Sequence, residues 1–468
     1  MEAVRKFARR SAAPTLVFVL STTVLYLYER WFRLNASPDQ MFEGYRFQAW
    51  TSNWTMQSLG LEDMLPFGPM ALWYDHIYPP GLDTLRYLFT WPETNQGLPH
   101  DPIQVDFRIY MLYAVLFGIL NALIYVWVRD LTESVAWSSV AAVLWAIYPG
   151  HLMMAMLLDP SELSLTNSAL MFFFLYRFLR TRKAHYVTLF LFFLLLASLS
   201  RSFIQTFFLI ILVAAVISFW FMTKGRARSW GWQIANIFLI AAILIHPLKM
   251  LALYDTSSTT SYGGYHRAGM LFLDPSTVPE PTEYPQEIID NALAFSSRYN
   301  TQEQIKDNYR LEAAANTYLA SEPLEAARGL ARSLTITVPE MLRPTSMYVQ
   351  NFLVEGLPWT NIYNWFFSSW RYLLLIAGAI AMIIWTRGWR GSAALLRRYG
   401  WFAVFWGLIA LPVIWSNRYI PGQEAEGPLW TDAIRQKIFL EMPVYVMLVY
   451  AASLLVSRMR PRSRREMP

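Results

Sequence analysis

The feature that most constrains the fold of this chain is a series of long apolar blocks, such as FFLIILVAAVISFW at residues 207–220. A helix of a water-soluble protein carries one apolar stripe, whereas these blocks are apolar on every side. Blocks of about 18 or more apolar residues are long enough to cross a bilayer. Inside lipid each segment must satisfy its own backbone hydrogen bonds, which favours helices. The sequence therefore predicts an all-α polytopic membrane protein.

The apolar blocks predict about ten transmembrane helices, each of a length suited to a bilayer. A high content of Trp and Tyr, 20 and 26 residues, suits a protein that is anchored at two membrane–water interfaces. The predicted spans lie near residues 13–33, 107–128, 134–152, 163–180, 186–200, 203–222, 231–250, 368–386, 400–416 and 438–456.

The distribution of basic residues predicts the orientation of these spans. With the N-terminus in the cytoplasm, the predicted cytoplasmic segments hold more than half of the 39 lysines and arginines, whereas the short outer turn YPGHLMMAMLLDPSE has none. Membrane proteins show the same excess of lysine and arginine on the cytoplasmic side of the bilayer. The first apolar run lacks a small-residue cleavage site, so we expect it to be a retained anchor. The basic cytoplasmic segments are RKFARR, Arg129, RFLRTRK, KGRAR, RGWRGSAALLRR and SRMRPRSRR.

Two predicted outer segments are too long to be simple connections, and they divide the chain into three parts. Residues 1–250 form an N-terminal membrane module with a first outer loop at 34–106 and seven spans. Residues 251–366 form an outer helical domain, in which the stretch from Gln302 predicts two helices broken at Pro323. Residues 367–468 hold the last three spans and a basic cytoplasmic tail. In the first outer loop, MFEGYRFQAW predicts a helix in the membrane interface.

Charged and polar residues in or beside the spans are the candidate functional residues, because burying them in a membrane is costly. All of them map to the outer side in this topology, where cations and carboxylates together suit an anionic lipid head group. Several also have purely structural interpretations: Arg201 as an interfacial anchor, Asp159 and Glu162 as caps of a first helical turn, and His246 as a helix-end residue. The set is Asp159, Glu162, Arg201, His246, Lys249, Arg418, Arg435 and Lys437.

Five stretches in this order resemble the polyprenyl-phosphate-sugar-dependent glycosyltransferases called GT-C, closest to the branch of protein O-mannosyltransferases and aminoarabinose transferases. The resemblance spans most of the chain, and it also includes the outer stretch TSYGGYHRAGMLF and the Ala-rich helix pair that follows. The five stretches are PDQMFEGYRFQAW, HIYPPGLDTLRYLF, LLDPSELSLTNSALMFF, ASLSRSFIQTF and the closing NRYIPG with RQKIFLEMPVYVMLVYAASLL.

The resemblance implies transfer of a sugar from a polyprenyl-phosphate donor at the outer face of a bacterial inner or plasma membrane. A carboxylate takes the acceptor proton, and fixed cations stabilise the leaving phosphate. The base is Asp39 or Glu43, because Phe42 stands where family members carry an Asp. The implied donor-phosphate ligands are Arg201, Arg435, Lys437 and Lys249, and the implied substrate contacts are Tyr45, His76, Tyr78, Asp159, Glu162 and Arg418.

The expected partners are the lipid-linked sugar, membrane lipids and a glycan, lipid or protein acceptor, and no nucleic acid is expected. No nucleotide-binding motif is present in the sequence, which agrees with a lipid-linked donor. No cofactor is required by the sequence, although a divalent metal would be compatible with the acidic residues. Two alternatives remain open: a flippase or transporter of a lipid-linked saccharide, and a catalytically inactive GT-C-like assembly factor. A transporter would favour charges spread along the spans and internal repeats.

Overall fold

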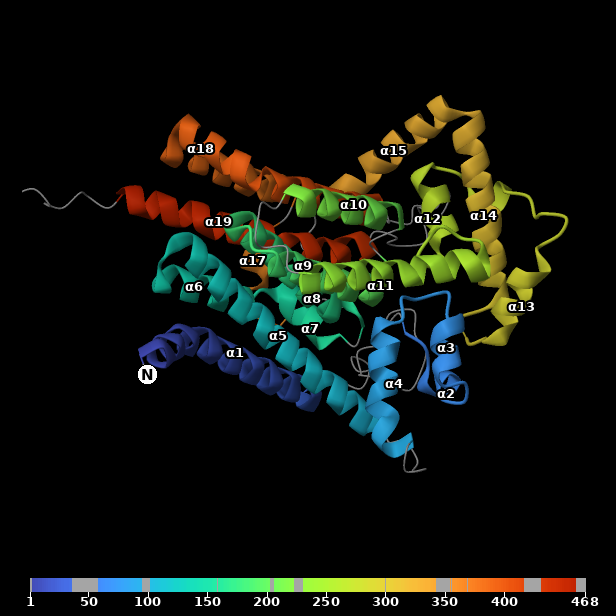
Figure 1. The fold of residues 1–468 in the computed structure, drawn as a ribbon, viewed down its shortest axis with the longest axis horizontal. Coiled ribbons are helices and arrows are strands. Elements are labelled where there is room, and N and C mark those ends of the chain that lie inside the picture. Colours follow the sequence, from blue (N-terminus) through green and yellow to red (C-terminus); the bar gives the residue numbers. More distant parts are fainter. Residues whose placement is uncertain are drawn as a thin grey trace, which may run out of the picture.

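The structure is a computed structural model, and the part of the chain that it describes is all-helical (Figure 1). It describes residues 2–35, 58–94, 102–157, 159–202, 206–222, 230–298, 300–341, 354, 356–367, 369–415 and 431–459. The helices are α1 (Glu2–Asn35), α2 (Leu61–Met64), α3 (Pro69–Tyr74), α4 (Gly81–Thr94), α5 (Pro102–Thr132), α6 (Val135–Ala146), α7 (Pro149–Met156), α8 (Ser161–Thr181), α9 (His185–Ser200), α10 (Thr206–Met222), α11 (Trp230–Tyr254), α12 (Gly263–Met270), the 3-10 helix η2 (Pro275–Thr277), α13 (Gln286–Ala294), α14 (Gln302–Ser321), α15 (Pro323–Met341), α17 (Thr360–Phe366), α18 (Ser369–Trp415) and α19 (Thr431–Met459).

Each of the ten predicted membrane-spanning ranges contains helix among its described residues. Among the described residues, five helices are long and apolar enough to cross a membrane, and a bent pair would raise this to six. The predicted all-helical architecture is therefore confirmed for the described residues, and the apolar helices are consistent with a membrane protein, while the number ten stays a prediction. One reason is length: α9 has 16 residues, so it extends about 24 Å, and a bilayer core is about 30 Å thick.

Two predicted spans are broken in ways that the apolar pattern does not reveal. The range 134–152 contains α6 and α7, which meet at an angle of 55°. Pro149 begins α7, and proline is compatible with the first turn of a helix but not with its interior. The two spans predicted at 368–386 and 400–416 lie in one element, α18, which breaks only at Gly388, where φ is 69°. Glycine adopts this backbone conformation without strain. The connection predicted at 387–398 is thus helical after Gly388.

The long helices pack side by side along the longest axis of the molecule (Figure 1). Helices α1 and α5, α8 and α9, and α18 and α19 form contacting pairs, and α5, α18 and α19 all contact α8. Their buried side chains form one core that includes Phe117, Trp145, Phe172, Phe190 and Phe439. This packing explains why α5 and α19 are largely buried although they are apolar all round.

The segments predicted to be cytoplasmic meet at one end of the bundle, which we call the basic end. Arg177 pairs with Asp130 at 2.5 Å, and Arg398 donates to the carbonyl of Arg180 over 3.0 Å. Arg458 donates to the carbonyl of Trp385. The beginning of α1 and the end of α19 lie at this end in Figure 1. The contacts agree with the predicted grouping of these segments on one side.

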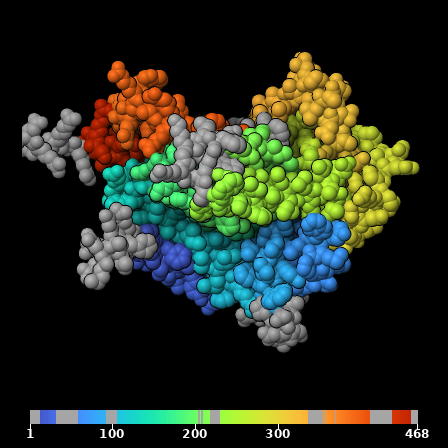
Figure 2. Space-filling model, viewed as in Figure 1, coloured from blue at the N-terminus to red at the C-terminus, as the bar shows by residue number. Residues whose placement is uncertain are grey.

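The opposite end carries the outer helices, and we call it the outer-domain end. Helices α12 to α14 lie there (Figure 1), and α13 contacts α3. A small apolar core joins Met250 and Tyr254 of α11 to α13 and α14. The predicted break at Pro323 is confirmed, because α14 ends at Ser321 and α15 begins at Pro323. In Figure 2, α15 and α18 stand out from the same face of the molecule with a recess between them.

Candidate functional site

The Pro-Pro turn of the first outer loop lies against the end of α9. Pro79 and Pro80 precede α4, which begins at Gly81. A Cβ atom at Gly81 would lie 2.6 Å from the carbonyl oxygen of Leu199, so only glycine fits this approach. His76 and Tyr78, both predicted to contact substrate, are buried at 0% and 5% exposure. The turn therefore packs Gly81 against the helix end that carries Arg201, whereas His76 contacts Ser261 and Asn300.

Arg201 is the centre of a buried polar cluster at the junction of α8 and α9, which we call the arginine cluster. Its Nη1 donates to Ser161 Oγ over 2.6 Å and lies 3.4 Å from Asp159 Oδ2. The side chains of Arg201 and Asp159 are each 2% exposed. Asp159 Oδ1 also accepts from the backbone of Ser161 over 2.7 Å. Asp159 thus accepts from the first backbone N–H of α8, although the N-cap position itself is Pro160 and has no side-chain cap. Asp159 also pairs with Arg201, so Arg201 is not an exposed interfacial anchor.

Glu162 lies in the first turn of α8 with both carboxylate oxygens buried. Its Oε1 is 3.5 Å from His151 Nε2 and accepts weakly from Thr166 over 3.5 Å. Its Oε2 has no hydrogen-bonding partner within the described part of the chain. The ring of His151 stacks on Phe117 with centroids 4.2 Å apart. A buried carboxylate oxygen without a donor is costly, which makes Glu162 a candidate for binding a polar ligand.

A second buried cluster joins the first outer loop to α11 and to the outer domain, and we call it the loop cluster. Lys249 Nζ donates to the carbonyl of Asp75 over 2.6 Å. His76 Nδ1 lies 2.9 Å from Ser261 Oγ, and the backbone of Ser261 donates to the carbonyl of His76 over 2.7 Å. The backbone of His76 donates to Asn300 Oδ1 over 2.9 Å. These hydrogen bonds therefore connect Asp75 and His76 of the first outer loop to Lys249, Ser261 and Asn300.

Burial perturbs the two titratable groups that precede the Pro-Pro turn. Burial, and then repulsion by Asp83, raises the pKa of Asp75 to about 7. Burial, and then the nearby charge of Lys249, lowers the pKa of His76 to about 3. Neither Asp75 Oδ2 nor His76 Nε2 has a hydrogen-bonding partner among the residues described. Perturbed groups of this kind are enriched at functional sites, and His76 is neutral at physiological pH.

Lys437 belongs to a third buried group, at the start of α19. Its Nζ lies 3.1 Å from Glu441 Oε1, and the two side chains are 4% and 2% exposed. Glu441 Oε2 accepts from the Tyr148 hydroxyl over 2.7 Å. The ammonium group lies 5.1 Å from the ring centroid of Tyr372. Lys437 is thus paired with a buried carboxylate of its own helix, and the next turn of α19 reaches the arginine cluster, where the Arg201 guanidinium lies 6.0 Å from the ring centre of Phe439. His246 Nε2 lies 2.9 Å from the carbonyl oxygen of Thr259.

Several predicted site residues fall outside the part of the chain that is described. These include both candidates for the catalytic base and the predicted interfacial helix of the first outer loop. Arg435 belongs to α19, but its side chain is not described. Asp39 and Glu43 are the two candidate bases, and Tyr45 and Arg418 are the other predicted site residues outside the described ranges.

Four of the residues that complete these clusters were not expected from the sequence. Glu441 lies four residues after Lys437, a spacing that places the two side chains on one helix face and could have been recognised. Asp75 directly precedes His76 in the stretch YDHIYPP, so the motif that identified His76 could also have identified Asp75. Ser161 and Ser261 offered no signal, because serine is common in helix first turns and in loops.

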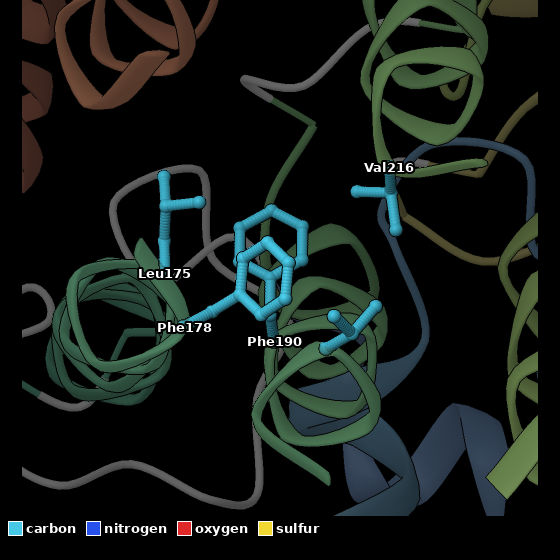
Figure 3. Close-up of a pocket in the computed structure, with 5 residues that line it drawn as sticks. Leu175, Phe178, Phe190 and Val216 are labelled. Atoms are coloured by element: carbon cyan, nitrogen blue, oxygen red, sulfur yellow. The ribbon is translucent and has the colours of Figure 1, made fainter. Parts of the chain in front are cut away.

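The chemistry that these clusters offer is proton transfer and stabilisation of an anion. Within the described ranges, no group of three or more His, Asp or Glu side chains is arranged to hold a metal ion. A pocket between α8, α9 and α10 is lined by apolar side chains, among them Leu175, Phe178, Phe190 and Val216 (Figure 3). It offers no polar group for catalysis, whereas the buried polar clusters described above lie at the outer-domain end.

Comparison with known proteins identifies no relative: no protein-family model matches the chain, and no curated protein matches it.

Proposed function

We propose that this protein is a membrane glycosyltransferase that moves a sugar from a polyprenyl-phosphate donor to a lipid, glycan or protein acceptor. The observation that carries the proposal is the arginine cluster, a buried guanidinium fixed by Asp159 and Ser161 at the outer-domain end. It lies next to the Pro-Pro turn, since Gly81 packs against the residues that precede Arg201. Two stretches that the sequence singled out separately thus support one site.

In this proposal the acceptor hydroxyl or amine attacks the anomeric carbon of the donor sugar. The bond between that carbon and the phosphate oxygen breaks, and the electron pair leaves with the polyprenyl phosphate. A first-loop carboxylate, Asp39 or Glu43, takes the acceptor proton. Arg201 stabilises the charge that develops on the phosphate, because a guanidinium binds a phosphate through two parallel hydrogen bonds.

The proposal assigns different tasks to the three cations of the outer-domain end. Arg201 binds the phosphate after a local displacement of the Ser161 hydroxyl, since its side chain is almost fully buried. Lys249 donates to the carbonyl of Asp75, so its role in the proposal is to hold the first outer loop in position. Lys437 has its own buried carboxylate partner, which favours a supporting role over direct phosphate binding.

The membrane topology is part of the proposal. Ten spans, with the basic end in the cytoplasm, would put the arginine cluster on the extracytoplasmic side of a bacterial inner or plasma membrane. Lipid-linked sugars presented on that side would reach it without a nucleotide. The concentration of basic residues at the opposite end supports this orientation.

Purified protein in nanodiscs tests the proposal with a panel of polyprenyl-phosphate hexoses and pentoses and a membrane lipid extract as acceptor. We expect release of polyprenyl phosphate, and we expect Arg201→Ala to lower turnover about 100-fold and to weaken donor binding. Arg398→Gln, at an exposed arginine of the basic end, is the matched control and should leave both unchanged. Donor binding without release across the panel would support an inactive assembly factor, and movement of the donor across the bilayer without release would support a flippase. Either result would reject the proposal.

A further inference from the structure

A cavity of about 420 Å³ opens at the basic end between the α5–α6 turn, α18 and α19. This lies at the opposite end of the bundle from the arginine cluster (Figure 1). The volume is within the range of small-molecule sites. Its polar lining includes Thr132, Glu133, Ser134, Arg387, Tyr450, Ser453 and Ser457.

Arg387 gives this cavity a positioned cation. Its Nη2 donates to the Tyr450 hydroxyl over 2.5 Å, and its guanidinium lies 5.9 Å from the centre of the Tyr450 ring. Arg387 immediately precedes the break at Gly388, so the chain direction changes just after it. A guanidinium held in this way is suited to a phosphate, whose geometry matches its donors.

Glu133 gives the same cavity a carboxylate. Its backbone is left-handed, with φ of 55°, which is uncommon for a residue other than glycine. The backbone is held in place because Glu133 donates to the carbonyl of Arg129 over 3.0 Å and Arg129 donates back to the carbonyl of Glu133. A carboxylate opposes an anion, so the cavity suits a ligand that carries a positive group beside its phosphate.

The hydroxyl groups of the lining point to the same kind of ligand. Thr132 donates to the carbonyl of Val128 over 2.8 Å, and Ser457 donates to the carbonyl of Ser453 over 2.7 Å. Ser453 likewise donates to the carbonyl of Tyr450 over 2.7 Å. Since each hydroxyl has one proton and two lone pairs, these three oxygens can only accept from a ligand and favour an N–H donor. The Ser134 hydroxyl instead accepts from the backbone of Trp137 over 3.3 Å, so it can donate its proton to a phosphate oxygen.

We infer that this cavity binds a phosphoethanolamine head group, with the phosphate at Arg387 and the ammonium group at Glu133 and the hydroxyl oxygens. The source that we favour is a phospholipid of the cytoplasmic leaflet. Basic pockets between membrane helices on the cytoplasmic side are known lipid head-group sites. Trp137, also in the lining, is a residue type enriched at membrane interfaces, and Leu131 and Leu454 offer apolar contacts for the acyl chains.

The experiment measures lipid binding to the full-length protein by native mass spectrometry and by the thermal shift in detergent. The probes are phosphatidylethanolamine, phosphatidylcholine, phosphatidylglycerol and soluble phosphoethanolamine. We expect phosphatidylethanolamine to bind about 10-fold more tightly than phosphatidylcholine, whose quaternary ammonium has no N–H donor. Arg387→Gln should weaken phosphatidylethanolamine binding about 10-fold, the size of one lost charged hydrogen bond. Glu133→Gln should weaken binding of phosphatidylethanolamine and reduce the preference over phosphatidylcholine, because the carboxylate charge is lost while the hydroxyl acceptors remain.

Arg390→Gln is the matched control, because Arg390 is exposed near the same turn and does not line the cavity. Equal binding of the ethanolamine and choline lipids, or unchanged binding by Arg387→Gln, would overturn the inference. Tighter binding of phosphatidylglycerol would overturn the role of Glu133. A thermal shift by soluble phosphoethanolamine equal to that of the lipid would overturn the lipid source. Circular dichroism of each variant identifies any change that comes from misfolding.

Discussion

The arginine cluster predicts that removing the charge of Asp159 destabilises the protein more than removing both charges of the pair. Asp159→Asn keeps one oxygen that can accept from the backbone of Ser161. It replaces the other oxygen, which accepts from the Ser161 hydroxyl and from Arg201, with an N–H donor, so the charge is lost together with these two contacts. Arg201 Nη1 and Asp159 Oδ2 are 3.4 Å apart, a distance at which two charges attract by about 5 kcal/mol at an effective dielectric constant of about 20. Both side chains are 2% exposed, so the surviving charge gains little from water.

We therefore expect Asp159→Asn to lower the free energy of unfolding by about 3 to 5 kcal/mol, as is usual when one partner of a buried pair is lost. The double variant with Arg201→Met should recover at least half of this loss, because no charge is then left buried. The assay is unfolding of purified protein in mixed micelles by SDS titration, followed by circular dichroism without substrate. A loss below about 1 kcal/mol, which is typical of exposed pairs, would refute the reasoning. So would a double variant whose loss equals the sum of the two single losses.

Three further predictions concern the loop cluster, the Pro-Pro turn and the orientation. The pKa of Asp75 is raised to about 7 in the folded protein, so the folded state binds more protons than the unfolded state between about pH 4 and 7. Asp75→Asn should therefore gain stability relative to the wild type as the pH rises through this window, and a constant difference in melting temperature from pH 5 to 8 would contradict this. Gly81→Ala should lower the melting temperature, because its Cβ would lie 2.6 Å from the Leu199 carbonyl; an unchanged value would contradict the close approach. Since the chain has no native cysteine, Arg390→Cys should resist an impermeant thiol reagent in intact cells while Ser276→Cys reacts, and the reverse pattern would invert the topology.

The helical content of this protein could be predicted from the sequence because long apolar blocks leave the backbone no other partner in lipid. The break between α14 and α15 could also be predicted, since Pro323 removes a backbone donor. The bend at Pro149 could not be predicted with the same rule, although the sequence shows a proline there. Proline is equally compatible with a helix start, and only packing decides between a bend and a continuous kinked span.

The clusters were only partly predictable, because a sequence indicates costly residues without indicating their partners. Arg201 and Asp159 were recognised separately, but they are 42 residues apart, and no local spacing connects them. His76 and Ser261 are separated by 185 residues and come together only when the outer domain packs on α11. The exception is the pair of Lys437 and Glu441. Residues four positions apart lie on the same face of a helix, so this contact could have been predicted from the sequence.

The two ends of the bundle use ion pairs in physically different ways, and this difference bears on function. At the basic end Asp130 pairs with both Arg177 and Arg180, and these side chains are 23% to 33% exposed, so water still screens the charges and they are less costly to keep than a buried pair. The pair of Arg201 and Asp159 at the outer-domain end is buried, and an apolar replacement of such a pair is often neutral or stabilising. A helix bundle that only had to fold could fill this position with apolar side chains. A buried guanidinium kept beside a rigid turn is therefore better explained by the chemistry of an anion than by stability.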